Sequence, residues 1–334
     1  MKVGRRKTWL GIIGFVLLYM TGCSTSSEAG DKPEEIRLDY AYYSPTSLVL
    51  KEFGWLEEAF ADEDIEIEWA LSQGSNKALE FLNSDSVDFG SAAGAATLLS
   101  KTNGAPIKNV YIFSNPEWTA LVANEESGIE AVEDLKGKKV AATLGTDPHI
   151  FLLRALNEAN LSVADLEIVN MQHGDGASSL LSGSVDAWAG LDPHMARLEL
   201  ESDAALFYRE IDFNTYGFLN VREEFAEDYP AYVERVIDVY ERAREWTEEN
   251  PRETAEILAK EAGIPMEVAE KQLERTDYAN PIPGEDHEQA LIEAGKVLQA
   301  GEVIDEQVEL EELISDLIEP QFAEEIIKEE TKGE

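Results

Sequence analysis

The segment VAATLGTDPHIFLLRALNEANLSVADLEIVNMQHGDGASSLLSGSVDAWAGLDPHM, residues 140–195, contains the pattern that decides the fold. Short apolar, β-branched runs alternate in it with stretches of helical periodicity. We expect strands at 140–144, 167–171 and 185–191, and helices from 147 and at 176–181. This alternation predicts an α/β fold with parallel strands, in which ligands bind beyond the carboxyl ends of the strands.

Two loops of this segment follow predicted strand ends. In the first, Gly145 to His149, a glycine turn precedes an Asp-Pro pair, which predicts Asp147 as a helix N-cap and Pro148 as the first helical residue. The second loop is Leu191-Asp192-Pro193-His194. We therefore expect this part of the chain to present both loops to a cleft.

The same alternation continues on both sides of the segment, and no internal repeat is present. Ser75 is the expected N-cap of a helix that follows it. The expected strands are 36–40, 65–69, 87–90, 107–114, 118–123, 204–208 and 216–220, and the expected helices are 48–60, 76–82, 91–97, 230–249, 252–261, 266–273 and 286–299.

Length and composition restrict the classes of function. The 334 residues, 44% of them hydrophobic, suffice for one large or two ordinary globular domains. The formal net charge of −41 argues against nucleic acid or an anionic membrane face as partner. The acidic surface is either generic solvated charge or an adaptation to a salty or alkaline medium.

Residues 1–22 have the pattern of an export signal. A basic start precedes an apolar stretch, 9–20, that is too short to span a bilayer. Met20-Thr21-Gly22-Cys23 then resembles the bacterial lipoprotein signal, in which the cysteine is acylated. We expect a lipid anchor on Cys23, a flexible tether over 23–35, and a location on the outer face of the cell membrane. The alternative is an ordinary secretory signal.

Four short stretches carry a resemblance to a known family. They are DLKGKKV at 134–140, Gly145-Thr146 with LLRAL at 152–156, VDAWA at 185–189 with Asp192-Pro193, and SVDFG at 86–90. Together they resemble the extracytoplasmic solute-binding proteins of the nitrate/sulfonate/taurine class that feed ABC importers. The strongest likeness is to aliphatic sulfonate-binding proteins.

The resemblance implies a type II periplasmic-binding-protein fold, with two α/β lobes joined by two crossing strands that close on a solute. Residues 36–118 and 216–325 would form lobe 1, and residues 119–215 would form lobe 2. The implied partners are a small-molecule solute, an ABC permease with its ATPase, and the membrane through the lipid anchor, with no nucleic acid. The implied function is capture and delivery of an aliphatic sulfonate or taurine-like solute, without catalysis or a cofactor.

The resemblance also assigns the solute site to loops of both lobes. A sulfonate at the helix starts near Ser75 or Thr146 would accept hydrogen bonds from N–H groups and lie at the positive end of the helix dipole. The apolar part would lie against Trp118 and Trp188. The implied contacts are Tyr42, Tyr43, Ser44, Gln73, Gly74, Ser75, Ala92, Ala93, Gly94, Trp118, Thr146, His149, Trp188, Asp192 and Tyr216.

Two loops depart from the family pattern. Where the family has two serines after the glycine, this chain has Thr146-Asp147, followed by Pro148. In the second loop, Leu191 replaces a tryptophan, and His194 replaces an aromatic residue. These changes leave open a nitrate-like anion, a pyrimidine or thiamine precursor, or a solute with an amine or a ring.

Other classes of function find less support in the sequence. An enzyme on the same fold and an extracellular sensor subunit stay open as alternatives. No recognised metal-ligand spacing or catalytic triad is present, and 174–176 is expected to be a simple turn. His149 is either a ligand contact or bonded to solvent, and His173 and His194 are expected to be surface or packing residues.

Overall fold

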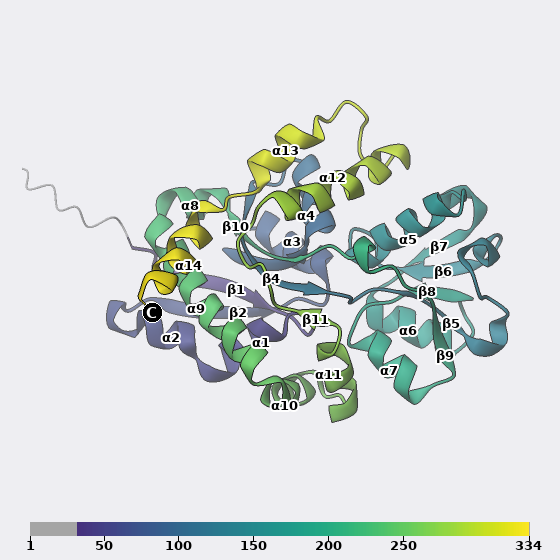
Figure 1. Cartoon of the computed structure of the whole chain (residues 1–334), viewed down its shortest axis with the longest axis horizontal. Coiled ribbons are helices and arrows are strands. Elements are labelled where there is room, and N and C mark those ends of the chain that lie inside the picture. The colour runs from purple at the N-terminus through teal and green to yellow at the C-terminus, as the bar shows by residue number, and fades with distance from the viewer. Residues whose placement is uncertain (1–31, 334) are drawn as a thin grey trace, which may run out of the picture. The chain divides into compact units, whose positions relative to one another are not determined.

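Two β-sheets with flanking helices organise residues 32–333, the part of the chain that the computed structural model describes (Figure 1). The predicted export signal, the Cys23 anchor and the tether up to residue 31 lie outside the described residues. The α/β fold class is confirmed by the two sheets and by the helices between their strands.

The first sheet has six strands in the order β11-β4-β10-β3-β1-β2, and the second has five in the order β7-β6-β8-β5-β9. Parallel pairs join β1 to β2 and β3, and β6 to β7 and β8, while β5 and β10 run antiparallel to their neighbours. The strands are β1 Glu35–Tyr40, β2 Glu66–Leu71, β3 Phe89–Ala93, β4 Ile107–Pro116, β5 Leu121–Asn124, β6 Lys139–Ala142, β7 Glu167–Asn170, β8 Ala187–Ala189, β9 Ala204–Tyr208, β10 Gly217–Arg222 and β11 Thr276–Asp277.

We call each sheet with its covering helices a lobe. The first lobe contains α1–α4 and α8–α14, and the second contains α5–α7 (Figure 1). The helices are α1 Pro45–Phe53, α2 Trp55–Phe60, α3 Ser75–Asn83, α4 Gly94–Thr102, α5 Asp147–Glu158, α6 His173–Leu181, α7 His194–Glu201, α8 Glu223–Asp228, α9 Pro230–Glu249, α10 Pro251–Ala262, α11 Met266–Leu273, α12 Glu285–Ala300, α13 Leu310–Leu317 and α14 Gln321–Gly333.

Several predicted boundaries are wrong, each for a local reason. The 48–60 helix is two helices, because Gly54 adopts a left-handed conformation with φ 64°. Ala92 and Ala93 belong to strand β3, which pairs with β10, and 118–123 contributes β5 to the second sheet. The 174–176 turn is the first turn of α6.

Both predicted N-caps are wrong by one residue, because each helix begins one position earlier than expected. Gly74 precedes α3, and the Ser75 hydroxyl instead accepts a 2.9 Å hydrogen bond from the Ala93 amide. Thr146 is the N-cap of α5, so Asp147 is its first residue. These polar side chains bond to other segments, and a local cap pattern does not reveal such contacts.

The main hydrophobic core lies around the first sheet and extends across the lobe boundary. Ile150 and Leu153 of α5 and Leu191 after β8 belong to this core, whereas the second sheet has smaller clusters of its own. Apolar burial therefore holds α5 against the first lobe as well as covering its own sheet.

Asp39 is a fully buried carboxylate at the end of β1, and its burial raises its pKa to about 6. The folded state therefore binds this proton more tightly than the unfolded state, and the stability due to Asp39 falls as the pH rises through 6. We expect the stability of Asp39→Asn relative to the native protein to rise by about 1.4 kcal/mol between pH 5 and pH 8. Urea unfolding of both proteins at pH 5 and at pH 8 measures this difference in the free energy of unfolding. Exposed Asp62→Asn is the control, and an equal difference at both pH values would contradict the assignment.

Candidate functional site

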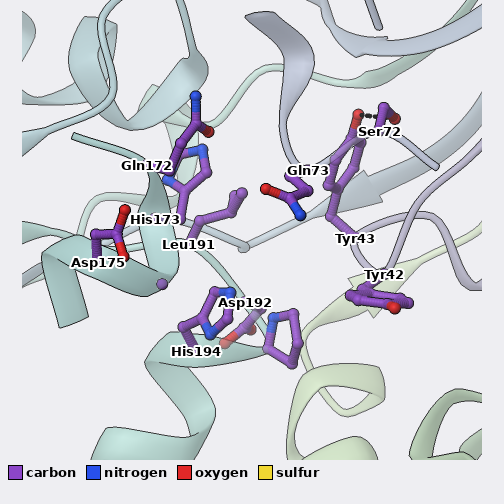
Figure 2. A pocket seen from close by; sticks show the side chains of 12 residues that line it. Tyr42, Tyr43, Ser72, Gln73, Gln172, His173, Asp175, Leu191, Asp192 and His194 are labelled. Carbon is purple, nitrogen blue, oxygen red and sulfur yellow. Dashed lines mark hydrogen bonds between the residues drawn. The ribbon is translucent and has the colours of Figure 1, made fainter. Parts of the chain in front are cut away.

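A cavity of about 240 Å³ lies between the two lobes (Figure 2). Its walls are the segments that follow β1 and β2 in the first lobe and β7 and β8 in the second. The site therefore lies at the carboxyl ends of parallel strands, as expected for this fold class. The lining residues are Tyr42, Tyr43, Ser72, Gln73, Gln172, His173, Gly174, Asp175, Leu191, Asp192, Pro193 and His194.

On the first-lobe wall, hydrogen bonds fix the orientation of Tyr43. Its hydroxyl donates to the Ser91 carbonyl at 2.8 Å and lies 3.1 Å from Ser72 Oγ, which in turn donates to Asp39. The ring packs edge-on against Trp118, with centroids 5.8 Å apart. Tyr43 is therefore a rigid aromatic surface for a solute, in contrast to the exposed Gln73 beside it.

On the second-lobe wall, the start of α6 faces the cavity. His173, Gly174 and Asp175 form its first turn and line the site, and no side chain caps this helix end. The first N–H groups of a helix have no intrahelical partner and lie at the positive end of its dipole. This end can therefore accept an oxyanion, although the Asp175 carboxylate lies in the same turn.

His173 is buried and neutral. The Thr143 hydroxyl donates its hydrogen to the Met171 carbonyl at 2.7 Å, so toward His173 Nδ1, at 3.2 Å, it can only accept. Nδ1 therefore carries the ring hydrogen and Nε2 is an acceptor without a partner. Burial lowers the pKa of His173 to about 3 and also lowers the pKa of His194.

Asp192 links the cavity to a contact between the lobes. Its Oδ1 accepts a 2.8 Å hydrogen bond from the Ala196 amide of α7, while Oδ2 lies 3.6 Å from Nη1 of Arg275. Arg275, which follows α11 in the first lobe, also pairs with Glu199 of α7. Burial raises the pKa of Asp192 to about 7, and the Arg275 charge opposes this rise.

The His173 ring reaches across to Gly74 of the first lobe. A side chain on Gly74 would begin 2.9 Å from His173 Nε2 and 2.9 Å from Asn76 Oδ1, which is too close for either atom. We expect Gly74→Ala to weaken solute binding at least about tenfold, because the lobes cannot close fully, with little change in folding. Calorimetric titration beside a melting curve separates the two effects. Unchanged affinity would contradict a closed cleft at this point.

Of the predicted contacts, Tyr42, Tyr43, Gln73 and Asp192 line the cavity. The remaining residues are not among those that line it, and ligand contact stays a prediction for them. Among them, Trp188 is fully buried in the core of the second lobe, and Thr146 donates from Oγ1 to the Thr143 carbonyl. The others are Ser44, Gly74, Ser75, Ala92, Ala93, Gly94, Trp118, His149 and Tyr216.

Asp147 occupies the helix start that the sequence suggested for an oxyanion. Its carboxylate is 1% exposed and accepts hydrogen bonds from Trp118 Nε1 at 2.8 Å, the Thr215 amide at 3.0 Å and Thr215 Oγ1 at 2.6 Å. These donors belong to the two segments that cross between the lobes. Asp147 therefore serves as a structural anion at this helix start.

Much of the second-lobe wall consists of residues that were not predicted as contacts. Gln172 to Asp175 follow the predicted strand 167–171, so the strand-end rule alone would have selected them. His173 and His194 were expected to be surface or packing residues, yet both line the cavity. No group of three or more potential metal ligands occurs among the described residues.

This geometry defines a solute-binding protein of the two-lobed periplasmic-binding-protein fold. Residues 50–254 match the model of the NMT1/THI5-like family, to which the chain belongs. A protein of Bacillus subtilis (strain 168) named for binding aliphatic sulfonates is 27% identical over 332 residues, which cover 98% of this chain and 99% of the relative. One with the same name from Escherichia coli (strain K12) is 29% identical over 266 residues, covering 79% and 83%.

The fold is shared with a solved structure. The alkanesulfonate-binding protein SsuA from Xanthomonas axonopodis pv. citri, bound to MOPS, superimposes with a TM-score of 0.79 at 24% identity, covering 86% of this chain and 99% of that one. The predicted fold and the predicted family resemblance are confirmed, and these relatives are named as binding proteins rather than enzymes.

Proposed function

We propose that this protein captures an aliphatic sulfonate or taurine-like solute between its lobes and delivers it to the permease of an ABC importer. The observation that carries the proposal is the uncapped start of α6 on the wall of a cavity between two lobes. A sulfonate has three oxygens that can accept hydrogen bonds from such a helix end. The names of the relatives from Bacillus subtilis and Escherichia coli support the same solute class.

The cavity suits a small solute with an apolar part. Its volume of about 240 Å³ lies just below the range of drug-sized pockets, which begins at about 300 Å³. Leu191, Pro193 and the tyrosine rings supply apolar surface in the lining of the same cavity. A short alkyl chain on the sulfonate would pack there, which an inorganic anion such as nitrate cannot do.

A thermal-shift screen of the soluble form from Ser24 onward tests the solute class. Alkanesulfonates and taurine are expected to raise the melting temperature, since binding only the folded state adds about 2.7 kcal/mol at one hundred times the dissociation constant. Nitrate and pyrimidine compounds are the comparison ligands. A shift with pyrimidines alone would replace sulfonate by a ring compound as the solute.

The anchor is the second part of the proposal. Cys23 follows the lipoprotein-like signal, and no helix among the described residues is long and apolar enough to span a bilayer. Acylation of Cys23 would hold the protein on the extracytoplasmic face of the cell membrane.

We expect Cys23→Ala to release the protein from membranes, because the acyl chains can no longer be attached. Fractionation of cells expressing either form, followed by immunoblotting, measures the distribution. Ser24→Ala is the matched control and should stay with the membrane fraction. A Cys23→Ala protein that still sediments with membranes would refute the lipid anchor.

A further inference from the structure

We infer that Asp39 is a positioning residue for the solute site, because it holds the Tyr43 ring in place through Ser72 only when it carries a proton. Capture of an anionic solute is then coupled to proton uptake by a side chain that does not itself line the cavity. This inference rests on the proposed function and adds a pH dependence to it.

Three contacts between oxygen atoms run in series from Asp39 to the backbone of β3. Asp39 Oδ2 is in hydrogen-bond contact with Ser72 Oγ, which lies 3.1 Å from the Tyr43 hydroxyl oxygen. The Tyr43 oxygen in turn lies 2.8 Å from the Ser91 carbonyl oxygen. Each contact needs one hydrogen, but the two hydroxyl groups supply only two. A protonated Asp39 supplies the third by donating to Ser72, so that Ser72 donates to Tyr43. The Tyr43 hydroxyl then donates to the Ser91 carbonyl.

An ionised Asp39 interrupts this series at one point. The Ser72 hydroxyl must then donate to the carboxylate, which leaves only the Tyr43 hydrogen for the two remaining contacts. One hydrogen cannot serve both contacts at full strength, and two oxygens that face each other without a hydrogen repel. The Tyr43 ring therefore loses one of the two contacts that fix its hydroxyl end.

The surroundings of Asp39 favour the protonated carboxyl. The side chain is fully buried, and no cationic side chain among the described residues pairs with it. The titratable groups that face it are the hydroxyls of Tyr43, in the loop after β1, and of Tyr240, on α9. The Ser91 amide donates to Oδ1 at 2.7 Å, and both forms of the carboxyl can accept this bond. Burial raises the pKa of Asp39 to about 6.

Tyr43 transmits the state of Asp39 to the solute, because it is the rigid aromatic part of the first-lobe wall. It lines the cavity, and its ring packs edge-on against Trp118. Figure 2 shows Tyr43 at the cavity with its hydroxyl joined to Ser72. The charge of an ionised Asp39 behind this wall also repels a sulfonate. The affinity for an anion is therefore highest below pH 6 and falls as the pH rises through the pKa of Asp39, about 6.

The test compares the native protein with Asp39→Asn at two pH values. The asparagine amide can donate to Ser72 while its oxygen accepts from the Ser91 amide, so this variant keeps the full series at every pH. Calorimetric titration of the soluble form from Ser24 onward uses ethanesulfonate, which stays ionised from pH 5 to pH 8. At pH 5 the two affinities should agree within about threefold. At pH 8 the native protein should bind at least about tenfold more weakly than Asp39→Asn.

Comparison at equal pH cancels the titration of Asp192, which both proteins contain. Exposed Asp62→Asn is the matched control in the same lobe and should bind as the native protein does at both pH values. An affinity ratio of native protein to Asp39→Asn that is the same at pH 5 and pH 8 would overturn the inference and leave the sulfonate function intact. No binding by either protein at either pH, with normal melting transitions, would reject the proposed function and the proton coupling together.

Tyr43→Phe tests whether the effect passes through the hydroxyl series. This variant keeps the ring but removes the oxygen that lies between Ser72 and the Ser91 carbonyl. In the Tyr43→Phe background, Asp39→Asn should change the affinity at pH 8 by less than about threefold. A tenfold effect that survives without the Tyr43 hydroxyl would overturn the assignment of Asp39 as a positioning residue.

Discussion

Asp147→Ala is expected to destabilise the folded protein by about 3–5 kcal/mol. The substitution leaves three donors, Trp118 Nε1, the Thr215 amide and Thr215 Oγ1, without their buried acceptor. Thr215 Oγ1 also accepts from the Ala95 amide at the start of α4, so the loss extends into the first lobe. Because these contacts join α5 to both crossing segments, the two lobes should lose their mutual support.

Urea denaturation monitored by circular dichroism measures the change. Asp147→Asn is the informative control, since its amide oxygen still accepts one hydrogen bond and its charge is removed. Burial raises the pKa of Asp147, which means that the folded protein already bears a desolvation penalty for the charged carboxylate. A loss below about 1 kcal/mol in Asp147→Ala would show that the network is dispensable.

Arg275→Met is expected to weaken solute binding by about 100-fold, with a smaller effect on folding. Arg275 is 6% exposed and pairs across the lobe boundary with Asp192 and Glu199. Its removal leaves the Asp192 carboxylate buried next to the solute without a counter-charge, which penalises the closed arrangement in particular. Lys271→Met is the matched control, because Lys271 lies 3.8 Å from Glu199 and is far more exposed.

Calorimetric titration of both variants with taurine and with ethanesulfonate gives the affinities, and thermal melting gives the stability. The affinity should fall in Arg275→Met for both solutes and change less than about threefold in Lys271→Met. Equal small effects in the two variants would mean that the lobes close without help from this buried pair.

The sequence predicted the architecture well because the fold depends on local patterns. Between residues 140 and 195, β-branched runs and amphipathic stretches follow one another at the spacing that parallel strands and covering helices require. The segments after those strands could therefore be identified as candidates for the cleft, and Asp192 and the Tyr42-Tyr43 pair do line it.

The individual contacts could not be predicted in the same way, because they depend on packing between distant segments. Trp188 packs closely against Gly176, because a Cβ added at Gly176 would lie 2.6 Å from Trp188 Nε1. Trp188 is also fully buried, and it therefore belongs to the core. His173 is buried and neutral, and its Nδ1 forms a hydrogen bond with Thr143, which lies thirty positions earlier in the chain. Neither relation leaves a periodic signal in the sequence.

The most direct test of the account is a calorimetric titration of the soluble protein, from Ser24 onward, with short sulfonates. We predict binding of one solute per chain, with a dissociation constant in the micromolar range or below, which corresponds to a binding free energy of about −8 kcal/mol or stronger. Gly74→Ala, which obstructs the contact between the lobes, should lower the affinity. The absence of binding heat for taurine and for every alkanesulfonate, from a protein with a normal melting transition, would contradict the account.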